Sequence, residues 1–125
     1  MKTLCILTRE RPSYRWKKWI DALADTQFAI KEINLHPADY KALLELKSDA
    51  VLLDGMLPHL SHIIILLRAL HADIPIIIAS EATSFAIQYE VWELGEKNYI
   101  SGPMGSDKFK KAIQNMVPAA EHIPH

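Results

Sequence analysis

Hydrophobic and polar residues alternate along this chain in blocks that have the lengths of strands and helices. Short runs rich in apolar residues predict strands at 4–7, 50–53, 76–79 and 98–101. Apolar and polar side chains alternate over 28–35, which favours a strand at the edge of a sheet. After each run, apolar residues at helical spacing predict helices at about 14–24, 37–46, 59–71, 83–94 and 106–116.

Strands that alternate with helices of this length form parallel sheets with helices on both faces, joined by right-handed crossovers. The pattern therefore predicts an α/β fold in which five βα units build one doubly wound sheet of five parallel strands. We expect one domain over residues 1–117. Residues 118–125 have no period and include Pro118 and Pro124, so we expect a C-terminal tail or the start of a linker.

Composition and charge narrow the classes of partner. A formal net charge of −1 gives no global field that would attract nucleic acid or an anionic membrane. The single cysteine, Cys5, lies in an apolar run, so we expect a buried thiol and no disulfide framework. No apolar segment is long enough for a membrane span or a signal peptide, and we therefore expect a soluble, cytoplasmic protein without a membrane partner.

Candidate chemistry gathers around one acidic residue. Four apolar residues lead into Asp54, and Gly55 and Pro58 follow it, as expected for a buried strand that delivers a carboxylate to its carboxyl end. In an open α/β sheet, ligands bind in the crevice outside the carboxyl ends of the strands. Polar residues also follow other predicted strands, at Thr8, Arg9, Ser80 and Gly102.

Three segments resemble the receiver domain of two-component response regulators, and the resemblance covers about 2–116. Residues 52–58 resemble the strand with the phosphoacceptor aspartate and a proline four residues later. Residues 75–82 resemble the fourth strand with its switch Ser or Thr, and 95–103 resemble the fifth strand with its switch aromatic and its proline. The resemblance implies a flavodoxin-like (βα)5 fold, Asp54 at the phosphoacceptor position, and Ser80 and Tyr99 at the switch positions.

The same resemblance exposes departures from an active receiver. An acidic pair after the first strand would hold Mg²⁺ together with the acceptor, and a lysine before the last proline would bind the phosphoryl oxygens. Here Thr8 and Arg9 occupy the acidic pair and Gly102 occupies the lysine position. One carboxylate beside a guanidinium offers Mg²⁺ little, so we expect no cofactor and no enzymatic activity. The alternative is a working response regulator, phosphorylated on Asp54 by a histidine kinase, with Glu10 as a second carboxylate.

Two hypotheses are open for the side chain of Arg9. Its guanidinium could bind the Asp54 carboxylate and hold the entrance of the site in one conformation. In the other interpretation, Arg9 points into solvent and Asp54 only caps the loop before the third helix. Ser80 and Tyr99 are likewise open to two interpretations, as a live switch or as ordinary strand residues.

The fourth helix carries apolar residues on two opposite sides. At 100° per residue, Ile87, Val91 and Leu94 fall on one side, and the aromatic residues fall on the other: Phe85, Tyr89 and Trp92. We expect the aromatic residues to face outward as a partner surface, unless the tail or a neighbouring helix covers them. In the family that the chain resembles, the fourth helix, fifth strand and fifth helix form the usual homodimer and output face.

Weaker signals complete the sequence. His59, His62 and His71 favour surface or capping positions over metal binding, since no supporting ligand is placed near them. Residues 63–67 are apolar all round and predict deep burial or a second contact surface. Residues 8–13 lack the glycine of an FMN phosphate loop. We therefore expect an atypical receiver-like domain that regulates or assembles through protein contacts, independently of phosphorylation.

Overall fold

A computed structural model describes residues 2–36 and 40–117. Five parallel strands form one sheet in the order β2-β1-β3-β4-β5, which confirms the predicted doubly wound fold and the edge position of β2. The strands are β1 (Thr3–Arg9), β2 (Ala29–Leu35), β3 (Ala50–Asp54), β4 (Ile76–Ser80) and β5 (Tyr99–Ser101). The predicted tail at 118–125 and the start of the second helix at 37–39 lie outside the described residues.

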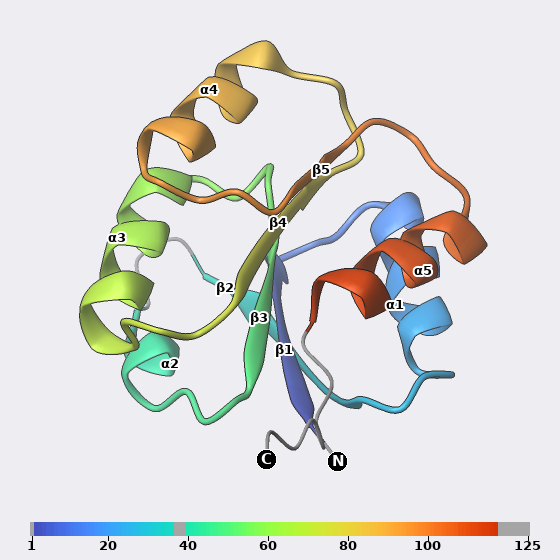
Figure 1. Ribbon diagram of the computed structural model, residues 1–125, viewed down its shortest axis with the longest axis horizontal. Coiled ribbons are helices and arrows are strands. Elements are labelled where there is room, and N and C mark those ends of the chain that lie inside the picture. The colour runs from blue at the N-terminus through green and yellow to red at the C-terminus, as the bar shows by residue number, and fades with distance from the viewer. Residues whose placement is uncertain (1, 37–39, 118–125) are drawn as a thin grey trace, which may run out of the picture.

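Helices cover both faces of the sheet. Figure 1 shows two helices on one face, α1 (Tyr14–Leu23) and α5 (Ser106–Met116). The opposite face carries α2 (Lys41–Leu44), α3 (Leu60–Leu70) and α4 (Phe85–Glu93). Because side chains alternate along a strand, Leu4 and Ile6 contact the α1/α5 side while Cys5 and Leu7 contact the other.

The core under α1 and α5 is built on aromatic rings. Trp16, Trp19 and Phe109 are fully buried, and the rings of Trp19 and Phe109 stack with centroids 4.2 Å apart. The indole Nε1 of Trp19 donates to the carbonyl oxygen of Met104 at 3.0 Å. These contacts fix the two helices to each other and to the sheet.

Element boundaries differ from the predicted ones for local reasons. Helix α4 begins at Phe85 rather than 83, because the Ser84 hydroxyl caps it by accepting the N–H of Ile87. Helix α3 begins after His59, whose φ of 59° is left-handed. Helix α2 ends at Leu44 instead of 46, since the chain turns there and buries Leu46 in the core on its way to β3.

The apolar run on α3 is partly explained by burial. Ile63, Ile64 and Leu67 are buried in the core, whereas Ile65 is 51% exposed.

Cys5 is buried as predicted. Within the described ranges, no helix combines the length and hydropathy needed to cross a membrane.

An arginine on α3 joins the two segments on either side of it. The Arg68 guanidinium donates to both carboxylate oxygens of Glu96, with Nε to Oε2 at 2.7 Å and Nη2 to Oε1 at 2.8 Å. Its Nη1 donates to the carbonyl oxygens of Ala72 and Ile74. The Glu96 side chain is only 4% exposed, so this bidentate ion pair is largely buried on the carboxylate side. It connects the loop after α4 to the end of α3.

Candidate site at the carboxyl edge of the sheet

Asp54 ends the central strand β3 and is completely buried. Its Oδ1 accepts the backbone N–H of Met56 at 2.9 Å. Its Oδ2 accepts two donors from the end of β1, the backbone N–H of Arg9 at 3.2 Å and the Nε of Arg9 at 2.6 Å. Both oxygens of the carboxylate are therefore engaged with the protein itself.

The Arg9 side chain joins two carboxylates. While its Nε binds Asp54, its Nη2 donates to Oε1 of Glu81 at 2.9 Å and to Oε2 at 3.1 Å. Glu81 follows β4, so the guanidinium spans from β1 across β3 to the loop before α4. The hypothesis of an Arg9–Asp54 pair is confirmed, and the alternative in which Arg9 points into solvent is wrong. The capping bond of Asp54 to Met56 exists beside the pair.

Burial and charge act in opposite directions on these groups. Burial raises the pKa of Asp54, against the opposing N–H of Met56 and the guanidinium of Arg9. Burial would also raise the pKa of Glu81, but Ser13 and the Arg9 guanidinium outweigh it, and the pKa falls below its usual value. Desolvation disfavours the charge of Arg9, yet the two carboxylates overcome it and raise the pKa of the guanidinium. Arg9 remains a cation at any accessible pH.

Thr8 and Gly102, the other two positions predicted to depart from an active receiver, lie at the end of β1 and directly after β5. Thr8 is buried at the end of β1, and its hydroxyl accepts from Nδ2 of Asn34 on β2 at 2.7 Å. Gly102 has a φ of 96°, and its N–H donates to the carbonyl oxygen of Ser80. A side chain at Gly102 would be strained in that backbone conformation, and its Cβ would lie 3.3 Å from Oγ1 of Thr83.

Ser80 and Tyr99 adjoin the site from β4 and β5. The Ser80 hydroxyl donates to the carbonyl oxygen of Ala82 at 2.9 Å and accepts the N–H of Ala82 at 3.2 Å. The Tyr99 hydroxyl is buried and has no hydrogen-bond partner within the described structure. Burial raises the pKa of Tyr99, and the Ser80 hydroxyl opposes this rise although no hydrogen bond joins the two side chains.

The residues present do not fit the magnesium ion that the resemblance implies for an active receiver. Mg²⁺ is held through carboxylate and other oxygen ligands, and here the Asp54 carboxylate is already paired with the cationic guanidinium of Arg9. Glu10 does not supply a second carboxylate: its side chain is 58% exposed, and Oε2 lies 3.8 Å from Nε2 of His36. The backbone N–H of Arg9, next to Glu10, donates to Asp54, so the Glu10 side chain leaves the chain beyond this contact and extends outward. No group of three metal-ligating side chains occurs among residues 2–36 and 40–117.

The aromatic side of α4 faces outward, as predicted. Phe85 is 80% exposed, Tyr89 59% and Trp92 69%, and we call these three residues the α4 aromatic surface. Val91 is buried, and Ile87 and Leu94 pack against the core. A groove of about 740 Å³ runs beside this surface, lined by Phe85, Gln88, Tyr89, Val91, Trp92, Glu96, Lys97 and Tyr99.

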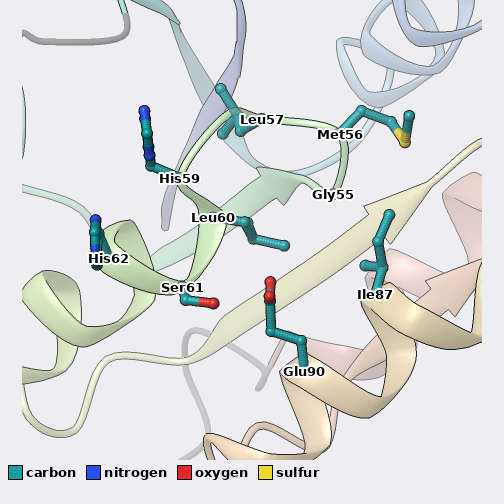
Figure 2. A pocket seen from close by; sticks show the side chains of 9 residues that line it. All are labelled: Gly55, Met56, Leu57, His59, Leu60, Ser61, His62, Ile87 and Glu90. Atoms are coloured by element: carbon teal, nitrogen blue, oxygen red, sulfur yellow. The ribbon is translucent and has the colours of Figure 1, made fainter.

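A second hollow lies between α4 and the start of α3. Figure 2 shows Ile87 and Glu90 extending from α4 toward the loop 55–57 and Ser61. The rings of His59 and His62 stack at 5.9 Å and point away from the Glu90 carboxylate (Figure 2). His59 and His62 are exposed, as predicted, whereas His71 is half-buried and its Nε2 lies 3.2 Å from the carbonyl oxygen of Leu43.

Glu81 is the functional candidate that sequence reasoning missed. It stands directly after the switch position, and β4 lies beside β3. Since carboxyl ends of parallel neighbours meet at one edge, an acid after β4 falls across Asp54 from a cation after β1. This strand order was the signal that could have identified it.

Comparisons with known proteins reveal structural likeness without sequence likeness. No protein-family model matches the chain, and no curated protein matches it. A CheY-like receiver domain protein from Methanospirillum hungatei superposes with a TM-score of 0.74 at 11% identity, over 94% of each chain. An orphan response regulator of H. pylori gives 0.74 at 13% identity, over 93% of this chain and 97% of that one.

A third solved structure represents a phosphorylated regulator. The response regulator from Burkholderia pseudomallei with a phosphorylated aspartic acid and a calcium ion gives a TM-score of 0.71 at 16% identity. The match covers 95% of this chain and 68% of that one. The chain therefore has the fold of response-regulator receiver domains, the CheY-like form of the flavodoxin fold.

Proposed function

We propose that this chain is a receiver-like signalling domain that regulates or assembles through protein contacts, without phosphorylation of Asp54 and without catalysis. The observation that carries the proposal is the Arg9 guanidinium bound to the Asp54 carboxylate. A carboxylate that attacks a phosphodonor needs an accessible oxygen and a metal ion that neutralises the developing charge. Asp54 is buried and both of its oxygens are already bonded.

The missing phosphoryl ligand supports the same proposal. An aspartyl phosphate would carry a charge of about −1.5 to −2 and would need cations around it. Gly102 stands at the lysine position with a backbone conformation that favours glycine. Within the described residues, the cation that hydrogen-bonds to Asp54 is Arg9, and its guanidinium also binds Glu81.

Intact-mass measurement after incubation with a small phosphodonor and Mg²⁺ tests this proposal. We expect no mass gain, in the wild type or in an Asp54→Ala control. A gain of one phosphoryl group in the wild type that is absent from Asp54→Ala would overturn the proposal and favour a working phosphoacceptor.

The α4 aromatic surface is the proposed contact site, and a second copy of this chain is the proposed partner. Tyr and Trp are enriched at interface hot spots. A single exposed apolar residue is ordinary, whereas three exposed aromatic residues on one helix form a patch of the kind that marks an interaction site. Helix α4 carries Glu90 and Glu93 and no basic residue. Helix α5 carries lysines at 108, 110 and 111, so α4 of one copy and α5 of the other are complementary in charge.

Sedimentation velocity tests the dimer. We expect Trp92→Ala to weaken self-association at least tenfold, as loss of a hot-spot residue does. Tyr14→Ala is the matched control, because Tyr14 is an equally exposed aromatic residue on α1, 74% exposed. A wild-type monomer at all concentrations, or equal weakening by both variants, would contradict this interface.

A further inference from the structure

Few side chains of helix α4 pack against the sheet. Among residues 85–93, Val91 alone is buried. Ile87 packs against the core from a partly buried position, and three of the large apolar side chains of α4 are more than half exposed. Contacts outside the helix therefore contribute to the direction in which the α4 aromatic surface points.

Two arginine–glutamate pairs stand at the two ends of this helix. Before the helix, Nη2 of Arg9 binds both oxygens of Glu81, four residues ahead of Phe85. After it, Arg68 binds both oxygens of Glu96, three residues beyond Glu93. Each pair links α4 to a part of the fold that is held firmly, since Arg9 ends β1 and Arg68 lies on α3.

The short segment between Glu81 and the helix can transmit position. The Ser80 hydroxyl bonds the N–H and carbonyl of Ala82, and the Ser84 hydroxyl caps the N–H of Ile87. These local bonds hold both ends of the short segment between Glu81 and the first turn of α4. We therefore expect a displacement of Glu81 to reach Phe85 through this segment.

The two glutamates differ in accessibility. Glu96 is 4% exposed and Glu81 is 20% exposed, whereas their arginine partners are exposed to a similar degree, Arg68 at 34% and Arg9 at 26%. Water can compete for the Glu81 carboxylate more readily than for the Glu96 carboxylate. The Glu81 end is thus the adjustable end, and the Glu96 end is the fixed one.

We propose that Glu81 is a positioning residue: through Arg9 it fixes the loop before α4, and with it the orientation of the α4 aromatic surface, directly from the Asp54 site. The inference deepens the proposed function, since it concerns the control of the same contact surface. In this proposal, the Arg9 guanidinium permanently links Asp54 to the loop before α4. The orientation of the surface therefore does not depend on modification of the aspartate.

Hydrogen exchange of the wild type and Glu81→Gln, followed by mass spectrometry, tests this link. We expect amides of 82–94 to exchange about two- to fivefold faster in Glu81→Gln, as for loss of a partly exposed ion pair. Amides of β1, β3 and α5 should keep the wild-type rates. Arg9→Lys should resemble Glu81→Gln over 82–94, because one ammonium cannot serve both carboxylates as a guanidinium fork does.

Glu45→Gln is the matched control, since it removes the same charge from an exposed position at the end of α2, outside both the α4 aromatic surface and the Asp54 site, and its rates should equal the wild type. Unchanged exchange over 82–94 in Glu81→Gln, or an equal acceleration in all elements, would overturn the proposal. The same pair of proteins is compared in a Trp92→Ala background. A local acceleration that persists there acts within one chain, so the result can be interpreted even if no dimer forms.

Discussion

The guanidinium of Arg9 is paired with the buried carboxylate of Asp54, with its Nε 2.6 Å from Oδ2. The pair forms because the carboxyl ends of β1 and β3 are neighbours in the parallel sheet. An active receiver would carry two or three acidic residues at this edge of the sheet, and their negative charges would repel one another. In this chain, a positive and a negative charge lie there and neutralise each other.

Replacing Arg9 by alanine should lower the free energy of unfolding by about 2–4 kcal/mol, because it leaves a fully buried carboxylate without its cation. Urea denaturation measures the change. Arg11→Ala, an exposed arginine two residues away, should change stability by less than about 0.5 kcal/mol. The double variant Arg9→Ala/Asp54→Asn should be less destabilised than the sum of its parts. Additive costs would mean that the two side chains do not interact in solution.

Titration of Asp54 should show a pKa above the usual aspartate value of about 3.9. A raised folded-state pKa means that the folded protein binds the proton more tightly than the unfolded chain does. The contribution of Asp54 to stability is therefore complete below about pH 3.9 and is lost as pH rises through the folded-state pKa.

Carboxyl ¹³C chemical shifts against pH provide the pKa, and denaturation of the wild type and Asp54→Asn over the same range provides the linkage. The stability of the wild type relative to Asp54→Asn should fall as pH rises across that window. A stability difference that grows with pH there would show that Arg9 outweighs burial, and a pKa at the unperturbed value would contradict the predicted rise.

Breaking the bond between Arg68 and Glu96 should destabilise the protein more than its position on the surface of α3 suggests. Arg68→Met leaves the Glu96 carboxylate, 4% exposed, without a counter-charge and frees two carbonyl oxygens, so we expect a loss of about 2–4 kcal/mol. Thermal unfolding measures it. Lys97→Met removes a cation beside Glu96 from an exposed position and should have little effect. Equal destabilisation by the two variants would assign the loss to general charge balance.

Gly102 should resist substitution by any side chain. Its φ of 96° is unfavourable for residues with a Cβ, so Gly102→Ser should cost about 1–2 kcal/mol of unfolding free energy. Gly105→Ser provides the comparison, because Gly105 has a φ of −68° and open space around its Cβ position. Chemical denaturation of both variants distinguishes them. If Gly102→Ser were as stable as the wild type, the backbone there would be free to accept a lysine.

The fold could be predicted because each level of the sequence pointed to the same structure. The β-branched run at Ile76–Ile78 could only be a buried strand, and the spacing of Ile87 and Val91 correctly oriented α4. The site was predicted only in part. Thr8, Arg9, Asp54 and Gly102 could be placed from the strand ends, but two directions remained open for the Arg9 side chain, toward Asp54 or into solvent.

The residues that sequence reasoning missed belong to long-range pairs. Glu81 is 72 positions from Arg9, and Glu96 is 28 positions from Arg68. No periodicity relates such positions, since side-chain partners across a sheet edge depend on strand order and rotamers. An exposed acid and a bridging acid look alike until the strand order is known.

The distribution of the tryptophans gives this chain an optical reporter. Two of the three, Trp16 and Trp19, are sealed beneath α1 and α5, while Trp92 is 69% exposed on α4. Emission from the sealed pair should be blue-shifted and protected from iodide, whereas emission from Trp92 should be red-shifted and readily quenched. Any partner that covers α4 therefore changes the quenchable fraction of the native fluorescence, and no label is needed to follow its binding.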